Sequence, residues 1–281
     1  MNAAYPPITT VRDVVSRALA EDVGPLGDIT AALLSSDVRA SADIVARAPG
    51  VLAGRLAATE AFAQVDPSVA VFWSDDDGDS IEPGKAVAHV AGPLIPILTA
   101  ERTALNLLGH LSGVATLTRR YVAAVGSKAR IRDTRKTTPG LRALEKAAVR
   151  AGGGVNHRGS LSDGILLKDN HLAGISIADA VEQARRRWPG RAVEVECDDR
   201  AQLKQALAAG VDMVLLDNMS PAQVAECVGD VAGVCLVEVS GGITLDNAAD
   251  YAAAGAALIS VGALTHSPPV LDIALDIQPA I

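Results

Sequence analysis

The second part of the chain repeats a strand-then-helix pattern at nearly regular spacing, and this repeat constrains the fold more than any other feature. Short runs of β-branched and other apolar residues alternate with segments of helical periodicity. The predicted strands are 129–134, 155–157, 165–168, 193–196, 213–217, 236–240 and 258–262. The predicted helices between the later strands are 177–187, 201–209, 222–228 and 247–254. Strands separated by helices in this way are expected to lie parallel in one sheet.

The spacing of the later strands narrows the choice of fold. Their last residues are Lys168, Glu196, Asp217, Ser240 and Gly262, at intervals of 28, 21, 23 and 22 residues. Such regularity favours an α/β barrel, in which the loops at the carboxyl ends of the strands form the active site. A doubly wound open sheet is the alternative, but no G-x-G-x-x-G phosphate loop follows the first strand.

The first part of the chain has a mixed pattern instead. Periodicity predicts helices at 11–22, 55–64 and 98–111, and apolar runs predict strands at 41–48 and 69–73. Turn-forming residues separate these elements. A chain of 281 residues has room for two modest domains or for one barrel with an attachment.

The composition argues against several classes of partner. A formal net charge of -8 disfavours nucleic acid and anionic membranes, which bind extensive basic faces. No apolar run approaches the ~18 residues of a membrane span, and residues 1–7 lack the features of a signal peptide. We therefore expect a cytoplasmic protein. The cysteines lack C-x-x-C spacing and are predicted to be reduced packing residues; they are Cys197, Cys227 and Cys235.

Positive charge is nevertheless concentrated in residues 131–171, which hold eight Lys or Arg residues against four acids. Concentrated cations attract and orient anions, so the expected partner is a small polyanion. Five cations or histidines follow predicted strands or glycines at places suited to a ligand: Arg135, Lys136, His157, Arg158 and Lys168. Three others fall at helical spacing and are predicted to be solvated surface residues: Arg142, Lys146 and Arg150.

Acids and glycines at other strand ends complete the predicted ligand site. Glu196 and Asp217 end neighbouring strands and suit a magnesium ion that keeps several waters and bridges to phosphates. Either acid could instead form a structural ion pair with Lys168 or Arg158. The stretches Ser240-Gly241-Gly242 and Val261-Gly262-Ala263 precede predicted helices, where glycines let backbone N–H groups approach a phosphate. A phosphosugar and an organic acid could meet at such a site.

Taken together, these motifs resemble the quinolinate phosphoribosyltransferase family. The motifs in the barrel part are TRKTTPGLRALEKAAVRAGGGVNHR, LLKDNH, EVE, LLDN, SGGI and VGALTHS, and those in the first part are EDVGPLGDIT and AERTALNLLGHLSGVAT. The resemblance implies an α/β fold, with an N-terminal α/β sandwich domain at 1–112 and an incomplete seven-stranded α/β barrel at 113–267. It also implies that the tail 268–281 packs on the first domain. The implied assembly is a homodimer with shared active sites, or a higher oligomer.

The resemblance further implies an activity and a role for each motif residue. The family transfers phosphoribosyl from 5-phosphoribosyl 1-pyrophosphate to quinolinate with decarboxylation, giving nicotinate mononucleotide, pyrophosphate and CO2 in NAD biosynthesis. The implied substrate-binding residues are Arg102, Thr134, Arg135, Lys136, His157, Arg158 and Lys168. The implied catalytic residues are Lys136, Lys168, Glu196 and Asp217, and the last two would also hold Mg2+. The implied phosphate-binding residues are Ser240, Gly241, Gly242, Val261, Gly262 and Ala263.

Two other functions fit parts of the pattern. A phosphoribosyltransferase of the same architecture could act on another aromatic acid, as in a homologue associated with molybdate transport. A non-catalytic phosphosugar-binding barrel would keep the glycine turns but would need neither Lys136 nor the acids Glu196 and Asp217. The presence of all three residues favours an enzyme.

Overall fold

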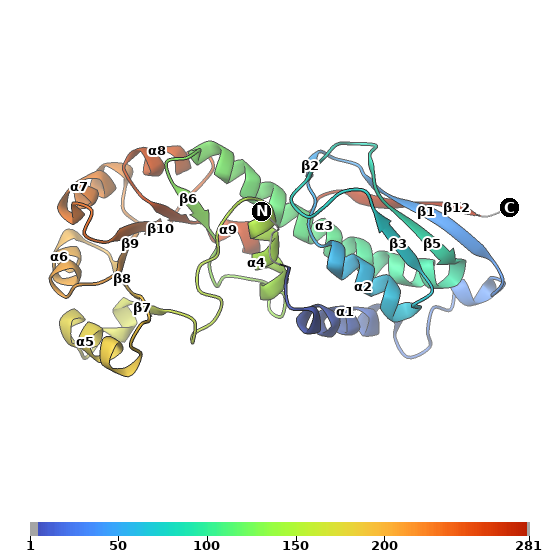
Figure 1. The fold of residues 1–281 in the computed structure, drawn as a ribbon, viewed down its shortest axis with the longest axis horizontal. Coiled ribbons are helices and arrows are strands. Elements are labelled where there is room, and N and C mark those ends of the chain that lie inside the picture. Colours follow the sequence, from blue (N-terminus) through green and yellow to red (C-terminus); the bar gives the residue numbers. More distant parts are fainter. Residues whose placement is uncertain (1–4, 280–281) are drawn as a thin grey trace. The chain divides into compact units, whose positions relative to one another are not determined.

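The computed structural model describes residues 5–279 and confirms the α/β class. The chain forms two compact units whose segments are interleaved in sequence. The first unit comprises the residues up to 119, residues 137–153 and the residues from 264 onward, and the second comprises 120–136 and 154–263. Figure 1 shows the elements of both units.

An antiparallel sheet and several helices build the first unit. The sheet order is β12 (Ile273–Pro279), β1 (Arg39–Ala46), β5 (Ala86–Pro93) and β3 (Ala70–Trp73). The helices α1 (Ile8–Val23) and α2 (Arg55–Val65) pack together beside this sheet (Figure 1). A separate two-stranded ribbon joins β2 (Gly50–Val51) to β4 (Ser80–Ile81). Apart from the helix predicted at 98–111, the predicted helices and strands of this part are present with ends shifted by up to three residues.

One helix of this part is much longer than predicted. The helix α3 spans Leu94–Val125, whereas helical periodicity predicted only 98–111. The sequence has glycines in this span, but they do not end the helix; Gly109 and Gly113 let residues 269–271 lie close against it. A Cβ atom at Gly113 would lie 2.1 Å from the carbonyl oxygen of Pro269, so only glycine fits there.

A parallel sheet of six strands forms the centre of the second unit. The sheet order is β6 (Arg130–Arg132), β11 (Leu258–Ser260), β10 (Leu236–Ser240), β9 (Met213–Asp217), β8 (Val193–Cys197) and β7 (Ile165–Leu167). The connecting helices are α5 (Ile177–Arg187), α6 (Arg200–Ala208), α7 (Pro221–Val231) and α8 (Ala248–Ala253). This arrangement confirms a partial α/β barrel, with β6 and β7 as its two edges.

The prediction of a seventh strand at 155–157 is wrong. Val155 makes only an isolated parallel bridge to Arg132. The next residues are drawn away from strand pairing by Asp133, whose carboxylate accepts hydrogen bonds from the His157 N–H (2.8 Å) and the Asn156 amide (2.5 Å). Because a side chain takes the donor that a strand would give to its neighbour, the ladder stops after one bridge.

The helix α4 (Arg142–Ala151) belongs to the first unit, so the compact units do not follow the predicted division at 112–113. The Arg119 guanidinium in α3 donates to the carbonyl oxygens of Gly152 and Ala151 at the end of α4. The prediction that the three α4 cations are solvated is also wrong. Lys146 is only 6% exposed, and Arg142 and Arg150 are half-buried, with the Arg142 guanidinium donating to the Thr137 hydroxyl (2.9 Å).

The cysteines match the expectation of reduced packing residues. All three are free, with Cys197 and Cys227 buried and Cys235 half-buried. Burial raises the pKa of the Cys197 thiol to about 12, which keeps it protonated and unreactive. Among the helices of residues 5–279, none combines the length and hydropathy that crossing a bilayer requires.

Candidate active site

The carboxyl ends of β7 and β8 bring together a lysine and a glutamate from the predicted site. Lys168 directly follows β7, and its ammonium group forms an ion pair with the Glu196 carboxylate on β8. The Glu196 side chain is 12% exposed and that of Lys168 is 41% exposed. The structural ion pair that the sequence left open is therefore present, and it engages one of the two Glu196 oxygens.

The next two strands bring Asp217 and Ser240 side by side. These residues pair in register at the ends of β9 and β10. Asn218, with a φ of 56°, donates its amide to the Asp217 carboxylate (2.6 Å) and its N–H to the Ser240 carbonyl oxygen (2.9 Å). A Cβ atom at Gly241 would lie 2.2 Å from the Asn218 side-chain oxygen, so this turn requires glycine. The turn thus sets an acid and a hydroxyl at one edge.

The two predicted phosphate-binding stretches differ in their local structure. Gly242 has a φ of 63° and open space at its Cβ position, and its carbonyl oxygen accepts a hydrogen bond from the Asn247 amide (3.0 Å). The helix after it begins only at Ala248, whereas α9 (Ala263–His266) begins directly after Gly262. The N–H of Val261 donates to the Arg132 carbonyl oxygen (2.9 Å), so Val261 has no backbone donor left for a phosphate.

Two predicted substrate-binding arginines lie within electrostatic reach of each other. Burial and the positive charge of Arg135 together lower the pKa of Arg158. Arg135 and Lys136 follow β6 on a turn in which the Thr134 hydroxyl accepts the Lys136 N–H (3.0 Å). Two guanidinium groups within electrostatic reach of each other, in a chain that is acidic as a whole, attract an anion with more than one negative group.

A buried polar network lies beneath these cations, and sequence reasoning missed most of it. The Arg132 guanidinium forms an ion pair with Glu238 on β10, and the Ser260 hydroxyl also donates to Glu238. His157 Nε2 lies 3.4 Å from Glu194 on β8 and 3.6 Å from Glu238. Burial raises the pKa of both carboxyls, that of Glu238 to about 7. A charged residue in the middle of the apolar runs VEVEC and LVEVS was the available signal.

A cavity of about 310 Å³ adjoins this network. Its lining includes the predicted residues His157 and Arg158 together with Arg132 and Glu194. It also includes residues near the starts of the strands β7, β8 and β9, namely Ile165, Ala192 and Met213. The predicted site residues are therefore spread along the barrel strands, with Lys168, Glu196, Asp217 and Ser240 at their carboxyl ends.

The remaining predicted residue, Arg102, lies on α3 in the first unit. Its side chain is 65% exposed and stands 3.7 Å from the Glu101 carboxylate. It lines a cavity of about 420 Å³ with Asn106 and residues 270–273. This position agrees with the expected polar face of the helix.

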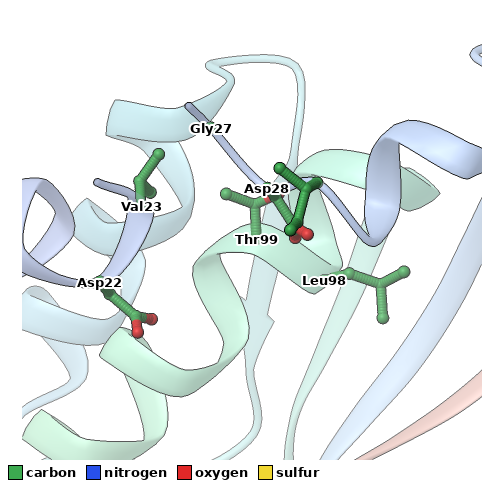
Figure 2. Close-up of a pocket in the computed structure, with 7 residues that line it drawn as sticks. Asp22, Val23, Gly27, Asp28, Leu98 and Thr99 are labelled. Carbon is green, nitrogen blue, oxygen red and sulfur yellow. The ribbon is translucent and has the colours of Figure 1, made fainter. Parts of the chain in front are cut away.

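A second cavity of the first unit, of about 290 Å³, is lined by Asp22 and Asp28, the two aspartates of the EDVGPLGDIT motif. Figure 2 shows Asp28 beside Thr99 of α3. The Asp28 carboxylate accepts hydrogen bonds from the Thr99 hydroxyl (3.1 Å) and from the N–H groups of Thr30 and Ala31. The Ala31 N–H contributes most to lowering its pKa. Asp28 therefore holds a turn together, which explains its place in the motif without a ligand.

Comparison with known proteins identifies the family. The model of the N-terminal domain of quinolinate phosphoribosyl transferase matches residues 28–112, and the model of the C-terminal domain matches 114–276. A nicotinate-nucleotide pyrophosphorylase (carboxylating) of Mycobacterium leprae (strain TN) is 46% identical over 276 residues, which cover 95% of this chain and 96% of that protein. A probable enzyme of the same name from Bacillus subtilis (strain 168) is 41% identical over 270 residues, covering 95% and 93%.

The fold leads to the same family. The solved structure of the nicotinate-nucleotide pyrophosphorylase from Francisella tularensis superposes with a TM-score of 0.92 at 38% identity, and the match covers 97% of both chains. Two domain models that together span most of the chain, and relatives that match it nearly end to end, agree with the motifs and with the partial barrel. The chain belongs to the quinolinate phosphoribosyl transferase family.

Proposed function

We propose that this protein transfers the phosphoribosyl group of 5-phosphoribosyl 1-pyrophosphate to quinolinate and releases CO2 and pyrophosphate, giving nicotinate mononucleotide for NAD biosynthesis. The observation that carries this proposal is the Asp217–Ser240 edge, with the Lys168–Glu196 ion pair at the neighbouring strand ends, in the same unit as Arg135 and Arg158. The arginines suit an acid with two carboxylates, and the edge suits a phosphosugar. A direct assay for nicotinate mononucleotide from the two substrates tests it.

The proposed reaction relies mainly on positioning and charge. Arg135, Arg158 and Lys168 hold the two carboxylates, so that the pyridine nitrogen faces the anomeric carbon of the sugar. As pyrophosphate departs, that carbon gains positive charge, and the carboxylates of Glu196 and Asp217 stabilise it and bind the ribose hydroxyls. Lys136 is exposed on its turn and can reach the departing phosphates.

Magnesium is part of this proposal. Glu196 and Asp217 supply carboxylate oxygens at neighbouring strand ends, which is the donor chemistry that Mg2+ prefers. The Lys168 ammonium engages one Glu196 oxygen, so the fit is to an ion that keeps several waters. When bound, Mg2+ would neutralise charge on the pyrophosphate.

Decarboxylation follows from the charge of the product ring. Once its nitrogen is ribosylated, the pyridinium ring stabilises the electron pair left at the neighbouring carbon when CO2 departs. The protein then needs to hold the other carboxylate and to let a proton reach that carbon. This step requires no further cofactor.

We also propose a homodimer in which Arg102 of one protomer completes the site of the other, with higher oligomers built from such dimers. The support is the family pattern together with the high exposure of Arg102 on α3. Arg102→Ala and Lys136→Ala chains, each inactive alone, should recover activity when they are unfolded together and refolded in equal amounts. In a mixed dimer one site has both residues intact and the other has neither.

With random pairing, half of the dimers are mixed, so activity should return to roughly a quarter of that of the wild type. Native mass spectrometry of the refolded sample checks that mixed dimers form. Mixed dimers without activity would mean that Arg102 serves its own chain. A cytoplasmic location stays a prediction from the sequence.

Among residues 5–279, no contact favours another aromatic acid over quinolinate as the substrate. An aromatic acid with a single carboxylate would offer only one anionic group to the two guanidinium groups of Arg135 and Arg158. A non-catalytic barrel would have no use for Lys136 and the acid pair. A comparison of kcat/KM for quinolinate and for nicotinate distinguishes both alternatives from the proposal.

A further inference from the structure

His157 lies between two buried carboxylates and the backbone of the next residue. Its side chain is 9% exposed. The Nε2 atom lies 3.4 Å from Glu194 and 3.6 Å from Glu238, and the Nδ1 atom lies 2.7 Å from the Arg158 backbone nitrogen. A backbone N–H can only donate, so Nδ1 must be the acceptor in this contact.

This contact determines where the imidazole proton lies. A neutral imidazole has one N–H and one acceptor nitrogen, so accepting at Nδ1 places the hydrogen on Nε2. The Nε2–H group then lies 3.4 Å from Glu194 and 3.6 Å from Glu238, whose carboxylate oxygens can accept from it. His157, Glu194 and Glu238 have ligand atoms within 4.8 Å of one another, a spacing that a metal ion could also bridge. A hydrogen on Nε2 excludes that use of the nitrogen, because no lone pair remains there.

Arg158 is anchored at two points. Its N–H is held by His157 Nδ1, and its guanidinium donates to the Gly164 carbonyl oxygen (3.1 Å). The same side chain lines the cavity of about 310 Å³. The backbone anchor therefore depends on the tautomer of His157, and the tautomer depends on the acceptors at Nε2.

We propose that Glu194 and Glu238 are positioning residues, which hold His157 as the Nε2–H tautomer so that its Nδ1 fixes Arg158 at the carboxylate-binding cavity. This inference rests on the proposed function for the identity of the ligand, a pyridine dicarboxylate. The arrangement links two strands of the barrel, β8 and β10, to the position of one substrate-binding guanidinium.

Glu238→Gln tests this linkage because the amide cannot replace both oxygens. Arg132 donates to one Glu238 oxygen and can accept nothing, so the new amide oxygen must stay on that side. The NH2 group then takes the place of the oxygen that faces both the Ser260 hydroxyl and His157 Nε2, and one of its two hydrogens is available to that nitrogen. Such a donor favours the Nδ1–H tautomer. In that tautomer two N–H groups face each other, and the hydrogen bond from the Arg158 N–H to Nδ1 is lost.

The tautomer is read by 15N correlation spectra of the imidazole rings near neutral pH, without substrates. The His157 signals are assigned by their loss in His157→Gln. We expect an Nε2–H ring in the wild type and an Nδ1–H or mixed ring in Glu238→Gln. Glu194→Gln is the second variant, in case Glu238→Gln does not fold, and should shift the ring in the same direction. Glu60→Gln, at an ion-paired glutamate of the first unit, is the control and should leave the ring unchanged.

Kinetics provide the second readout. Both cluster variants should raise the KM for quinolinate roughly tenfold, because the Arg158 N–H loses its acceptor and the guanidinium is no longer held in place. The KM for 5-phosphoribosyl 1-pyrophosphate should change less than about twofold, whereas general damage would affect both. A wild-type ring with the hydrogen on Nδ1, or variants with unchanged tautomer and KM, would overturn the proposal. Because the spectra need no turnover, they decide it even if quinolinate is not the substrate.

Discussion

Asp217→Ala and Glu196→Ala should each lower kcat by roughly a hundredfold or more, because each removes a carboxylate from the edge where charge develops in the proposed transition state. Both side chains are half-buried at strand ends, outside the packed core. The midpoint of thermal unfolding should therefore change by only a few degrees. Steady-state kinetics over a range of Mg2+ concentrations, with unfolding followed by circular dichroism, would measure both effects.

The matched control for these variants is Glu226→Ala. Glu226 is an exposed acid on α7 that pairs with Arg200 at the protein surface. An exposed pair contributes little to stability, so this variant should keep full activity and stability. If Asp217→Ala and Glu196→Ala unfold the protein, or if they retain wild-type kcat, the two acids are structural.

Quinolinate should be used at least about a thousandfold better than nicotinate, measured as kcat/KM. A site built to bind a polar group rejects analogues that lack the group, because its own buried groups are then left without a partner. Here the relevant group is the Arg158 guanidinium, whose pKa is lowered by burial and by the positive charge of Arg135, so a second carboxylate offsets a cost that a single carboxylate does not. The comparison needs only the two acids and a saturating concentration of the phosphosugar.

Arg158→Ala should narrow this preference, mainly by weakening the use of quinolinate. Arg187→Ala removes an exposed arginine from α5 and should leave the preference unchanged. Equal kcat/KM for the two acids in the wild type would show that the arginine pair does not bind two carboxylates, and would favour another aromatic acid as the substrate.

Much of the fold could be predicted because the parallel strands carry a strong local signal. The strands at 213–217 and 236–240 and the helix at 177–187 match the prediction residue for residue. The seventh strand failed because Asp133 competes for the donors of the next segment, and this competition depends on a contact across 24 residues. The exposure predicted for Lys146 was wrong for a related reason, since helical spacing does not show which other segments of the unit cover α4.

The site was predictable to the extent that it lies at strand ends. Lys168, Glu196, Asp217 and Ser240 lie where the spacing placed them. The buried residues Glu194 and Glu238 could not be predicted because they lie within strands. The sequence of a strand does not show which side chains a glutamate in it contacts. Only the folded structure brings them to His157.

One active site is expected to couple phosphoribosyl transfer to decarboxylation. The most direct measurement uses quinolinate labelled in the carboxylate next to the ring nitrogen and follows labelled CO2, pyrophosphate and nicotinate mononucleotide in the same reaction. The three products should form in equal amounts, and only when both substrates are present. Pyrophosphate released without CO2, or no nicotinate mononucleotide at all, would contradict it.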